Sequence, residues 1–310
     1  MRRVAAAFGL CCAIALPAIG PDGMRARAQS ADPFAGRMGS PLPSPGVTGP
    51  SLPALPAESE ADLALSASLA GTGQPLRSGL AWRIYEDRSD GVRPGIVARS
   101  SEPSPRFRLA PGAYVATVTY GYASASKRVA MAGAPVSDQL RIGAGALRLA
   151  GAIGDQRIAP NQLAFSVFVP IGANSEGRLV RGGVKAGEVL RLPEGTYHVV
   201  STYGESNAIQ RADLRVENGR VTEATMNHRA ATMTLKLVAA PGAEAFAGTA
   251  FSVLTPGGDT IREAIGAFPQ VTLAEGDYVL IARHDGQVYT REFKVESGMD
   301  RDVEVVAKAS

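Results

Sequence analysis

The sequence predicts an all-β protein in which three tandem antiparallel β-sandwich domains follow a signal peptide and a disordered linker. The first observation is a motif, Leu-x-x-Gly-x-Tyr, that occurs at residues 109–114, 192–197 and 273–278. Its tyrosines are 197 − 114 = 83 and 278 − 197 = 81 residues apart, a period that indicates a tandem repeat. The second observation is that each motif leads into a short β-rich run, whereas no long segment has the 3.6-residue period of a helix.

The composition agrees with many short strands joined by turns. Glycine accounts for 35 and proline for 21 of the 310 residues, and aromatic residues make up only 6%. Glycine and proline are typical of tight turns. Because aromatic residues are few, each core has to be built mainly from Val, Leu, Ile and Ala. A chain of 310 residues is expected to form two or three domains.

Residues 1–28 have the three parts of an export signal. Arg2 and Arg3 supply a positive start, and residues 4–19 an apolar stretch. Ala26-Arg27-Ala28 is a cleavage site of the A-x-A type, and Leu16-Pro17-Ala18 is an earlier alternative. The apolar stretch is shorter than the roughly 20 residues that a membrane-spanning helix needs. We therefore expect a periplasmic protein, with secretion or surface display as further destinations and a membrane anchor only if the signal stays uncleaved.

Cleavage of this signal would change the charge and the cysteine content. Residues 1–28 hold four arginines and one aspartate, so the rest holds 32 − 4 = 28 basic and 29 − 1 = 28 acidic residues. A neutral chain gives no electrostatic reason to expect nucleic acid as a partner. Both cysteines, Cys11 and Cys12, leave with the signal, so the mature chain is expected to form neither a disulfide nor a thiolate metal site.

Residues 29–60 have the composition of a disordered linker. Seven prolines interrupt the segment, and the residues between them show no apolar period. Such a segment cannot bury enough apolar surface to offset the entropy of ordering it. We interpret it as a passive spacer, with a Pro-rich docking peptide as the alternative.

The first predicted sandwich covers residues 61–142. It opens with an alternating strand at 63–69, and Trp82 lies in the second strand. Asp90-Gly91 predicts a tight turn. The motif then leads into a strand at 114–120 that Gly121 ends.

The second and third predicted sandwiches, residues 143–229 and 230–310, repeat this order. Phe165 precedes its motif tyrosine by 32 residues, as Trp82 does, so the two residues occupy the same strand of the repeat. Asn218-Gly219 follows a strand and predicts a β-hairpin turn. About seven short strands per unit is the pattern of an antiparallel sandwich.

The glycine and tyrosine of each motif predict a structural corner. A tyrosine that packs across a sheet connection and bonds back to the backbone fixes how the chain crosses between sheets. The corner residues are Gly112, Tyr114, Gly195, Tyr197, Gly276 and Tyr278.

This corner and the strand order resemble the carboxypeptidase regulatory-like and Cna-B-type domains, whose immunoglobulin- or prealbumin-like sandwiches occur in envelope and surface proteins. The chain is also similar to exported alphaproteobacterial proteins with the same repeat. The resemblance covers all three units. It implies a fold and an extracytoplasmic setting, and no particular ligand.

The residues that could carry chemistry form no catalytic set. Some Cna-B-type domains contain a Lys–Asn or Lys–Asp cross-link, but Lys236 lies between two leucines of an alternating strand and is expected to face solvent. His198, His228 and His284 lack the spacing of metal ligands, and no G-x-S-x-G motif is present. We therefore predict no catalytic, metal-binding or cofactor-binding residues and no cofactor.

Three aromatic positions are candidate binding residues. Tyr120, Tyr203 and His284 each lie six residues after a corner tyrosine, beside a glycine-containing loop. Aromatic side chains at loop ends are frequent binding positions, although plugging the end of a core is the simpler interpretation. Trp82 suggests stacking on a glycan, but phenylalanines at the equivalent positions of the other units favour a core role.

These observations leave three function hypotheses. The first is a non-enzymatic cell-envelope protein that acts as a structural or protein-binding scaffold, because edge strands of sandwiches can pair with a partner strand. The second is a glycan-binding module for peptidoglycan or exopolysaccharide. The third, an envelope enzyme, requires polar residues from different units to meet in a cleft.

Overall fold

The computed structural model describes residues 59–88 and 95–307, so the predicted signal peptide, residues 29–58 of the predicted linker and the Asp90-Gly91 turn lie outside the described residues. Apart from one short 3₁₀ helix, η1 (Pro160–Gln162), the regular structure of the described chain consists of strands. The predicted all-β fold class is confirmed. No helix within the described residues is long and apolar enough to cross a membrane.

The strands fall into three groups that follow the sequence repeat. The first repeat contains β1 (Ala61–Leu69), β2 (Leu80–Glu86), β3 (Ile96–Ser100), β4 (Arg106–Leu109), β5 (Gly112–Tyr120), β6 (Ala123–Met131) and β7 (Val136–Ile142). The second contains β8 (Ala144–Ile153), β9 (Gln156–Arg157), β10 (Leu163–Ile171), β11 (Asn174–Val184), β12 (Val189–Pro193), β13 (Gly195–Tyr203), β14 (Ile209–Val216) and β15 (Val221–Asn227). The third contains β16 (Ala230–Val238), β17 (Ala250–Leu254), β18 (Thr260–Ile265), β19 (Gln270–Ala274), β20 (Gly276–His284), β21 (Gln287–Val295) and β22 (Arg301–Val306).

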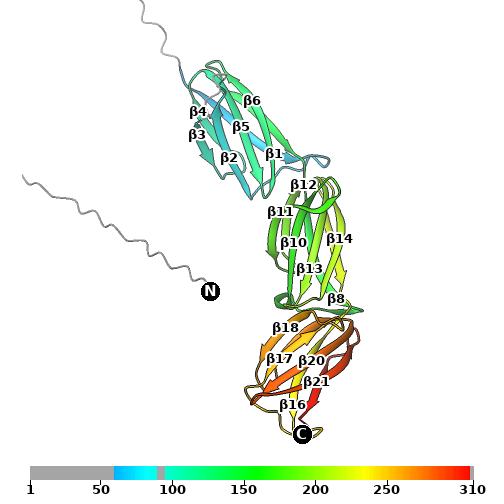
Figure 1. Cartoon of the computed structure of the whole chain (residues 1–310). Coiled ribbons are helices and arrows are strands. Elements are labelled where there is room, and N and C mark those ends of the chain that lie inside the picture. The colour runs from blue at the N-terminus through cyan, green and yellow to red at the C-terminus, as the bar shows by residue number, and fades with distance from the viewer. Residues whose placement is uncertain (1–58, 89–94, 308–310) are drawn as a thin grey trace, which may run out of the picture. The chain divides into compact units, whose positions relative to one another are not determined.

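Each repeat folds into two sheets with the same strand order, and the colours of Figure 1 separate the three pairs of sheets. The three-stranded sheets have the orders β4-β1-β7, β12-β8-β15 and β19-β16-β22, with β9 added to β8. The four-stranded sheets have the orders β3-β2-β5-β6, β11-β10-β13-β14 and β18-β17-β20-β21.

One pairing in each repeat departs from the antiparallel pattern. The first strand of the repeat lies beside the last strand, and the two are parallel: β1 with β7, β8 with β15, and β16 with β22. Seven residue pairs connect β8 to β15, from Ala146–Val221 to Ala152–Asn227. The chain therefore enters a repeat at one end of this pair and leaves it at the other end.

Alternation along the strands places one apolar face of each sheet inside. In β1, Leu63, Leu65 and Ala67 are buried, because successive side chains of a strand point to opposite faces. The equivalent aromatic residues Trp82, Phe165 and Phe251 are 1%, 0% and 1% exposed. Trp82 thus has the core position that its strand pattern favours, and its indole nitrogen donates to the Glu102 carbonyl at 3.1 Å.

The hairpin predicted at Asn218-Gly219 is wrong. Gly219 lies in a turn with φ +72°, but β14 pairs with β13 and β15 pairs with β8, so the turn joins strands of different sheets. The turn wraps around Gly145, where an added Cβ would lie 2.1 Å from the Glu217 carbonyl oxygen. The Asn-Gly signal marked a turn correctly, whereas the pairing of the flanking strands depended on which apolar face each strand had to bury.

Candidate functional site

The three corner tyrosines make the same hydrogen bond in each repeat. The hydroxyl of each donates to the carbonyl oxygen four residues earlier, over 3.0 Å for Tyr114 to Ala110, 2.9 Å for Tyr197 to Pro193 and 2.9 Å for Tyr278 to Ala274. Each ring lies over its motif glycine, since an added Cβ at Gly112, Gly195 or Gly276 would be 3.5–3.8 Å from that ring.

Two of these phenols differ in their surroundings. Burial raises the pKa of Tyr197 above its usual value, and the nearby Arg178 charge acts in the opposite direction. Burial also raises the pKa of Tyr278, although the Asn207 amide, which donates to its hydroxyl at 2.8 Å, offsets part of the rise. Both phenols therefore stay neutral at physiological pH and are suited to hold the chain rather than to transfer protons.

The structure places Tyr120, Tyr203 and His284 in different repeats and does not bring them into one site. Tyr120 is half-buried, and the Arg191 guanidinium lies 4.7 Å from the centre of its ring. Tyr203 is buried and meets the ring of His228 edge-on at 5.8 Å. His284 stacks on Phe246 at 5.1 Å.

A Ser–His pair in the second repeat is hydrogen-bonded like a catalytic nucleophile and its base, but it is buried where a substrate has no access. Ser201 Oγ and His228 Nε2 are 2.8 Å apart, and the two residues are 0% and 2% exposed. No substrate can reach a hydroxyl at this depth. No group of three or more His, Cys, Asp or Glu residues within 59–88 and 95–307 is placed to hold a metal ion.

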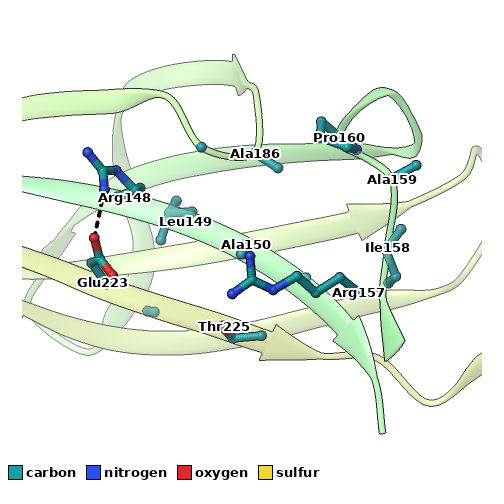
Figure 2. A pocket seen from close by; sticks show the side chains of 13 residues that line it. Arg148, Leu149, Ala150, Arg157, Ile158, Ala159, Pro160, Ala186, Glu223 and Thr225 are labelled. Atoms are coloured by element: carbon teal, nitrogen blue, oxygen red, sulfur yellow. Dashed lines mark hydrogen bonds and ion pairs between the residues drawn. The ribbon is translucent and has the colours of Figure 1, made fainter. Parts of the chain in front are cut away.

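A cleft of about 390 Å³ lies on the outer face of the second repeat, over β8 and β15 (Figure 2). Leu147 and Leu149 of β8 point into the core, so Arg148 and Ala150 point outward. In the neighbouring parallel strand, Thr225 is the register partner of Ala150. Two small side chains therefore form the floor of the cleft.

Two loops hold the edge of β8 on either side of this floor. β12 accompanies β8 only as far as Arg148, and beyond it the Gly187 amide donates to the Leu149 carbonyl at 2.8 Å. Further along, the Ile158 amide donates to the Gly151 carbonyl at 3.0 Å. The cleft is the gap that these two attachments leave along the strand edge.

Two arginines flank the floor, and they differ in their partners. Arg148 donates to Glu223 at 2.8 Å, an ion pair whose side chains are 48% and 65% exposed and which therefore contributes little to stability. Arg157 of β9 forms no ion pair with any described residue. Figure 2 shows its side chain extending along β8 toward Ala150 and Thr225.

A second cavity, also of about 390 Å³, adjoins the cleft. The two share Arg157, Ile158 and Ala159. The second cavity is polar: amide, hydroxyl and carboxylate groups line it, among them Gln156, Gln162, Tyr203, Thr232, Gln270 and Asp300. Of the three candidate binding residues, Tyr203 borders this cavity, and Tyr120 borders a smaller one of about 160 Å³.

Sequence reasoning missed the residues of this cleft. The outward direction of Arg148 follows from its place between two core leucines, but Arg157 comes close only because β9 folds back on β8. A signal for that fold is present, since Gly154-Asp155 separates the paired residues Ile153 and Gln156 and has the composition of a two-residue hairpin loop.

Lys236 lies on the outer face of its strand. Its register partner on β22 is Glu304, and its ammonium group pairs with Asp302. The buried polar residues of the described chain are Ser, Thr and His, so no buried carboxylate accompanies this pair.

Comparison with known proteins finds one family model that matches part of the chain. Residues 232–307, which form most of the third repeat, match the model of the Rhizobiales growth-associated tandem repeat domain. The match is not to the carboxypeptidase regulatory-like type, so that finer resemblance stays a prediction. No curated protein matches the chain by sequence.

Several solved structures of bacterial proteins, pilins among them, are similar to this chain. The Bacillus anthracis TIE protein is 13% identical with a TM-score of 0.24. The match covers 80% of this chain and 51% of the TIE protein, so this chain spans about half the length of the TIE protein. A streptococcal ancillary pilin is 11% identical, with 81% and 100% coverage and a TM-score of 0.28. The shaft pilin SpaA of Lactobacillus rhamnosus GG is 13% identical, with 55% and 97% coverage and a TM-score of 0.28. Similarity at this level says nothing about what the chain binds.

Proposed function

We propose that the protein is a non-enzymatic, exported component of the cell envelope whose repeats act as a tension-bearing scaffold. The periplasm is the proposed location. The description of the matched family links its repeat to growth, which agrees with a role in an envelope that is stretched and remodelled as the cell enlarges.

The observation that carries this proposal is the parallel pairing of the first and last strands of each repeat. When the two ends of a repeat are pulled apart, parallel neighbours slide past one another, and the ladder hydrogen bonds between them are loaded together. When an antiparallel hairpin is pulled at its open end, the bonds are loaded one after another. Seven residue pairs in β8–β15 and six in β16–β22 would share such a load.

Free sheet edges give the scaffold a means of binding other envelope proteins. β3, β11 and β18 are edge strands of the four-stranded sheets, and each has a register shift in its pairing with the neighbouring strand. Bulges of this kind blunt an edge and limit indiscriminate pairing. Ile265, at the end of β18, is 78% exposed and is a candidate contact for such a partner.

Single-molecule force spectroscopy tests the mechanical proposal. The chain is pulled once through its two ends and once through cysteines placed at Gly195 and Val216, which unzips the antiparallel β13–β14 pair. We expect the second repeat to need a several-fold higher unfolding force in the end-to-end pull than in the unzipping pull. Equal forces in the two directions would contradict the scaffold proposal.

Export is tested separately. Fusion of residues 1–60 to a reporter that is active only outside the cytoplasm should give activity, and replacing Arg2 and Arg3 by glutamate should reduce it. Activity that needs neither the apolar stretch nor the arginines would contradict the proposed location.

Glycan binding is a second candidate function, and one observation favours it. The cleft of the second repeat continues into a cavity lined by side-chain amides, which suit a hydroxyl-rich ligand better than an apolar one.

A further inference from the structure

We propose that the cleft on β8 and β15, together with the adjoining cavity, binds a saccharide that carries a carboxylate, such as a chain containing uronic acid. This inference rests on the second candidate function, glycan binding, and names its ligand class; it does not depend on the tension-bearing role. The cleft would hold the carboxylate, and the cavity would hold the neighbouring sugar hydroxyls.

The anionic part of the proposal rests on Arg157. Its guanidinium has no ion-pair partner among the described residues, and its side chain lies over the small floor formed by Ala150 and Thr225. A guanidinium presents two parallel N–H groups that match the two oxygens of a carboxylate. The Thr225 hydroxyl at the floor provides a further donor beneath the same space.

The charge balance favours a carboxylate over a phosphate. Arg148 and Arg157 give the cleft two positive charges, and Glu223, which is paired with Arg148 at 2.8 Å, removes one of them. A single negative charge on the ligand neutralises the remainder. A phosphate dianion would leave an excess of negative charge beside Glu223, and like charges at this range repel.

The lining of the adjoining cavity points to a saccharide. Gln156, Gln162 and Gln270 bring three primary amides to one cavity, each able to donate and accept hydrogen bonds. Sugar hydroxyls also donate and accept, so amides match them in either direction. Because Asp300 already accepts from the Thr232 amide at 2.7 Å, its charge is partly satisfied within the protein.

The equivalent surface of the third repeat shows what a filled site looks like. The register places Lys236 and Glu304 where the second repeat has Ala150 and Thr225. Lys236 also pairs with Asp302, so side chains of the protein itself occupy the position proposed for the ligand. The two repeats therefore share a scaffold, and the second combines the small floor with Arg157, which forms no ion pair with a described residue.

Isothermal titration calorimetry of the purified protein with galacturonate and glucuronate trisaccharides tests the proposal. We expect saturable binding that weakens at least about tenfold in Arg157→Gln, the change expected when one charged hydrogen-bonding partner is removed. Ala150→Lys, which imports the side chain of the third repeat, should also weaken binding at least about tenfold. The control Arg215→Gln removes an exposed arginine on β14 that does not line the cleft, and it should leave binding unchanged.

Two further measurements identify which group of the ligand the cleft binds. The methyl ester of the galacturonate trisaccharide keeps the hydroxyls and loses the charge, and it should bind at least about tenfold more weakly if Arg157 holds the carboxylate. Inorganic phosphate at the same concentration should not compete. Four outcomes would each overturn the proposal. They are no binding of either acidic trisaccharide, equal affinity for the acid and the ester, full competition by phosphate, and an affinity of Arg157→Gln equal to that of the wild type. Thermal unfolding of the surface variants at the wild-type temperature verifies that they remain folded.

Discussion

The outer faces of the second and third repeats differ although the strands beneath them are paired in the same way. In both repeats the first and last strands run parallel, and apolar residues of both strands pack into the core. Outward, the second repeat has Ala150 beside Thr225, whereas the third has Lys236 beside Glu304. One face is open over its floor, and the other is filled by the ion pair of Lys236 with Asp302.

This difference shows which part of a repeat is constrained. The inward positions of each strand must fill one core, so a change of even one methylene is felt there. The outward positions face water, and their side chains can be exchanged with little effect on folding. A repeat protein of this kind can therefore change its surface chemistry one unit at a time, as function is carried by sites placed on a common fold.

The largest expected effect comes from the matched core residues Phe165 and Phe251. Replacing either with alanine should destabilise its own repeat by about 3–5 kcal/mol, because a large buried side chain is lost and a cavity is left. Hydrogen exchange read by mass spectrometry locates the loss. Ile265→Ala, at a position 78% exposed, serves as the control with little change expected. Loss of protection spread equally over all three repeats would show that they do not unfold separately.

A glycine and an alanine at equivalent positions give the next test. Gly145 and Ala231 both pair with the corner leucine of their repeat, yet a Cβ on Gly145 would lie 2.1 Å from the Glu217 carbonyl oxygen. Gly145→Ala should cost about 1–3 kcal/mol, since the turn at Glu217 has to move. The reciprocal Ala231→Gly should cost about 1 kcal/mol or less. Urea unfolding measures both, and equal costs would mean that the turn moves freely.

The buried pair Ser201–His228 makes the second repeat sensitive to pH, unlike the first. Burial lowers the pKa of His228, with the Ala208 carbonyl acting against that fall, and its Nδ1 has no partner that meets hydrogen-bond geometry. The folded state therefore favours the neutral ring. The contribution of the neutral ring to the free energy of unfolding is fully present above the unfolded-state pKa of about 6.5. It declines as the pH falls from there toward the lowered pKa of His228 in the folded state.

The first repeat supplies the control for this effect. Val118 and Ile142, both 0% exposed, occupy the positions equivalent to Ser201 and His228. The double variant Ser201→Val and His228→Ile should remove the loss of stability between pH 7 and pH 5 that we expect of the wild-type second repeat. Thermal unfolding across this range is the measurement, and an unchanged pH dependence would assign the effect to other groups.

The smallest expected effect concerns the outer faces themselves. Lys236→Ala removes the ion pair with Asp302 and the contact with the Phe268 ring, whose centre lies 5.6 Å from the ammonium group. Because Lys236 is 20% and Asp302 51% exposed, we expect a loss of about 1 kcal/mol or less that shrinks further in high salt. A loss of several kcal/mol would show that the outer faces are not freely exchangeable.

The repeated fold could be predicted from the sequence because its signals are local. Apolar and polar residues alternate within 63–69, which is a signal between neighbours in the chain. The equal spacing of Trp82 and Phe165 from their corner tyrosines is a signal at a fixed period. The pairing around Asn218-Gly219 could not be predicted in this way. It depends on Gly145, more than 70 residues earlier, around which the turn bends.

The candidate site could not be predicted from the sequence for the same reason. Arg148, Arg157 and Thr225 come from three strands, and β9 is only two residues long, so no sequence window holds more than part of the set. Sequence reasoning instead favoured Tyr120, Tyr203 and His284, which the period relates to one another. A period identifies equivalent positions in different repeats, and equivalent positions of different domains do not by themselves meet in space.

The parallel pairing of the terminal strands also bears on how such a chain arises. Because a repeat is entered at one end of this pair and left at the other, a copied gene segment inserted after β7 or β15 can continue from where the previous unit stops. Only Gly143 separates β7 from β8, and only His228 and Arg229 separate β15 from β16. Duplication therefore needs no new connecting segment, and the number of units can change during evolution without rebuilding any one of them.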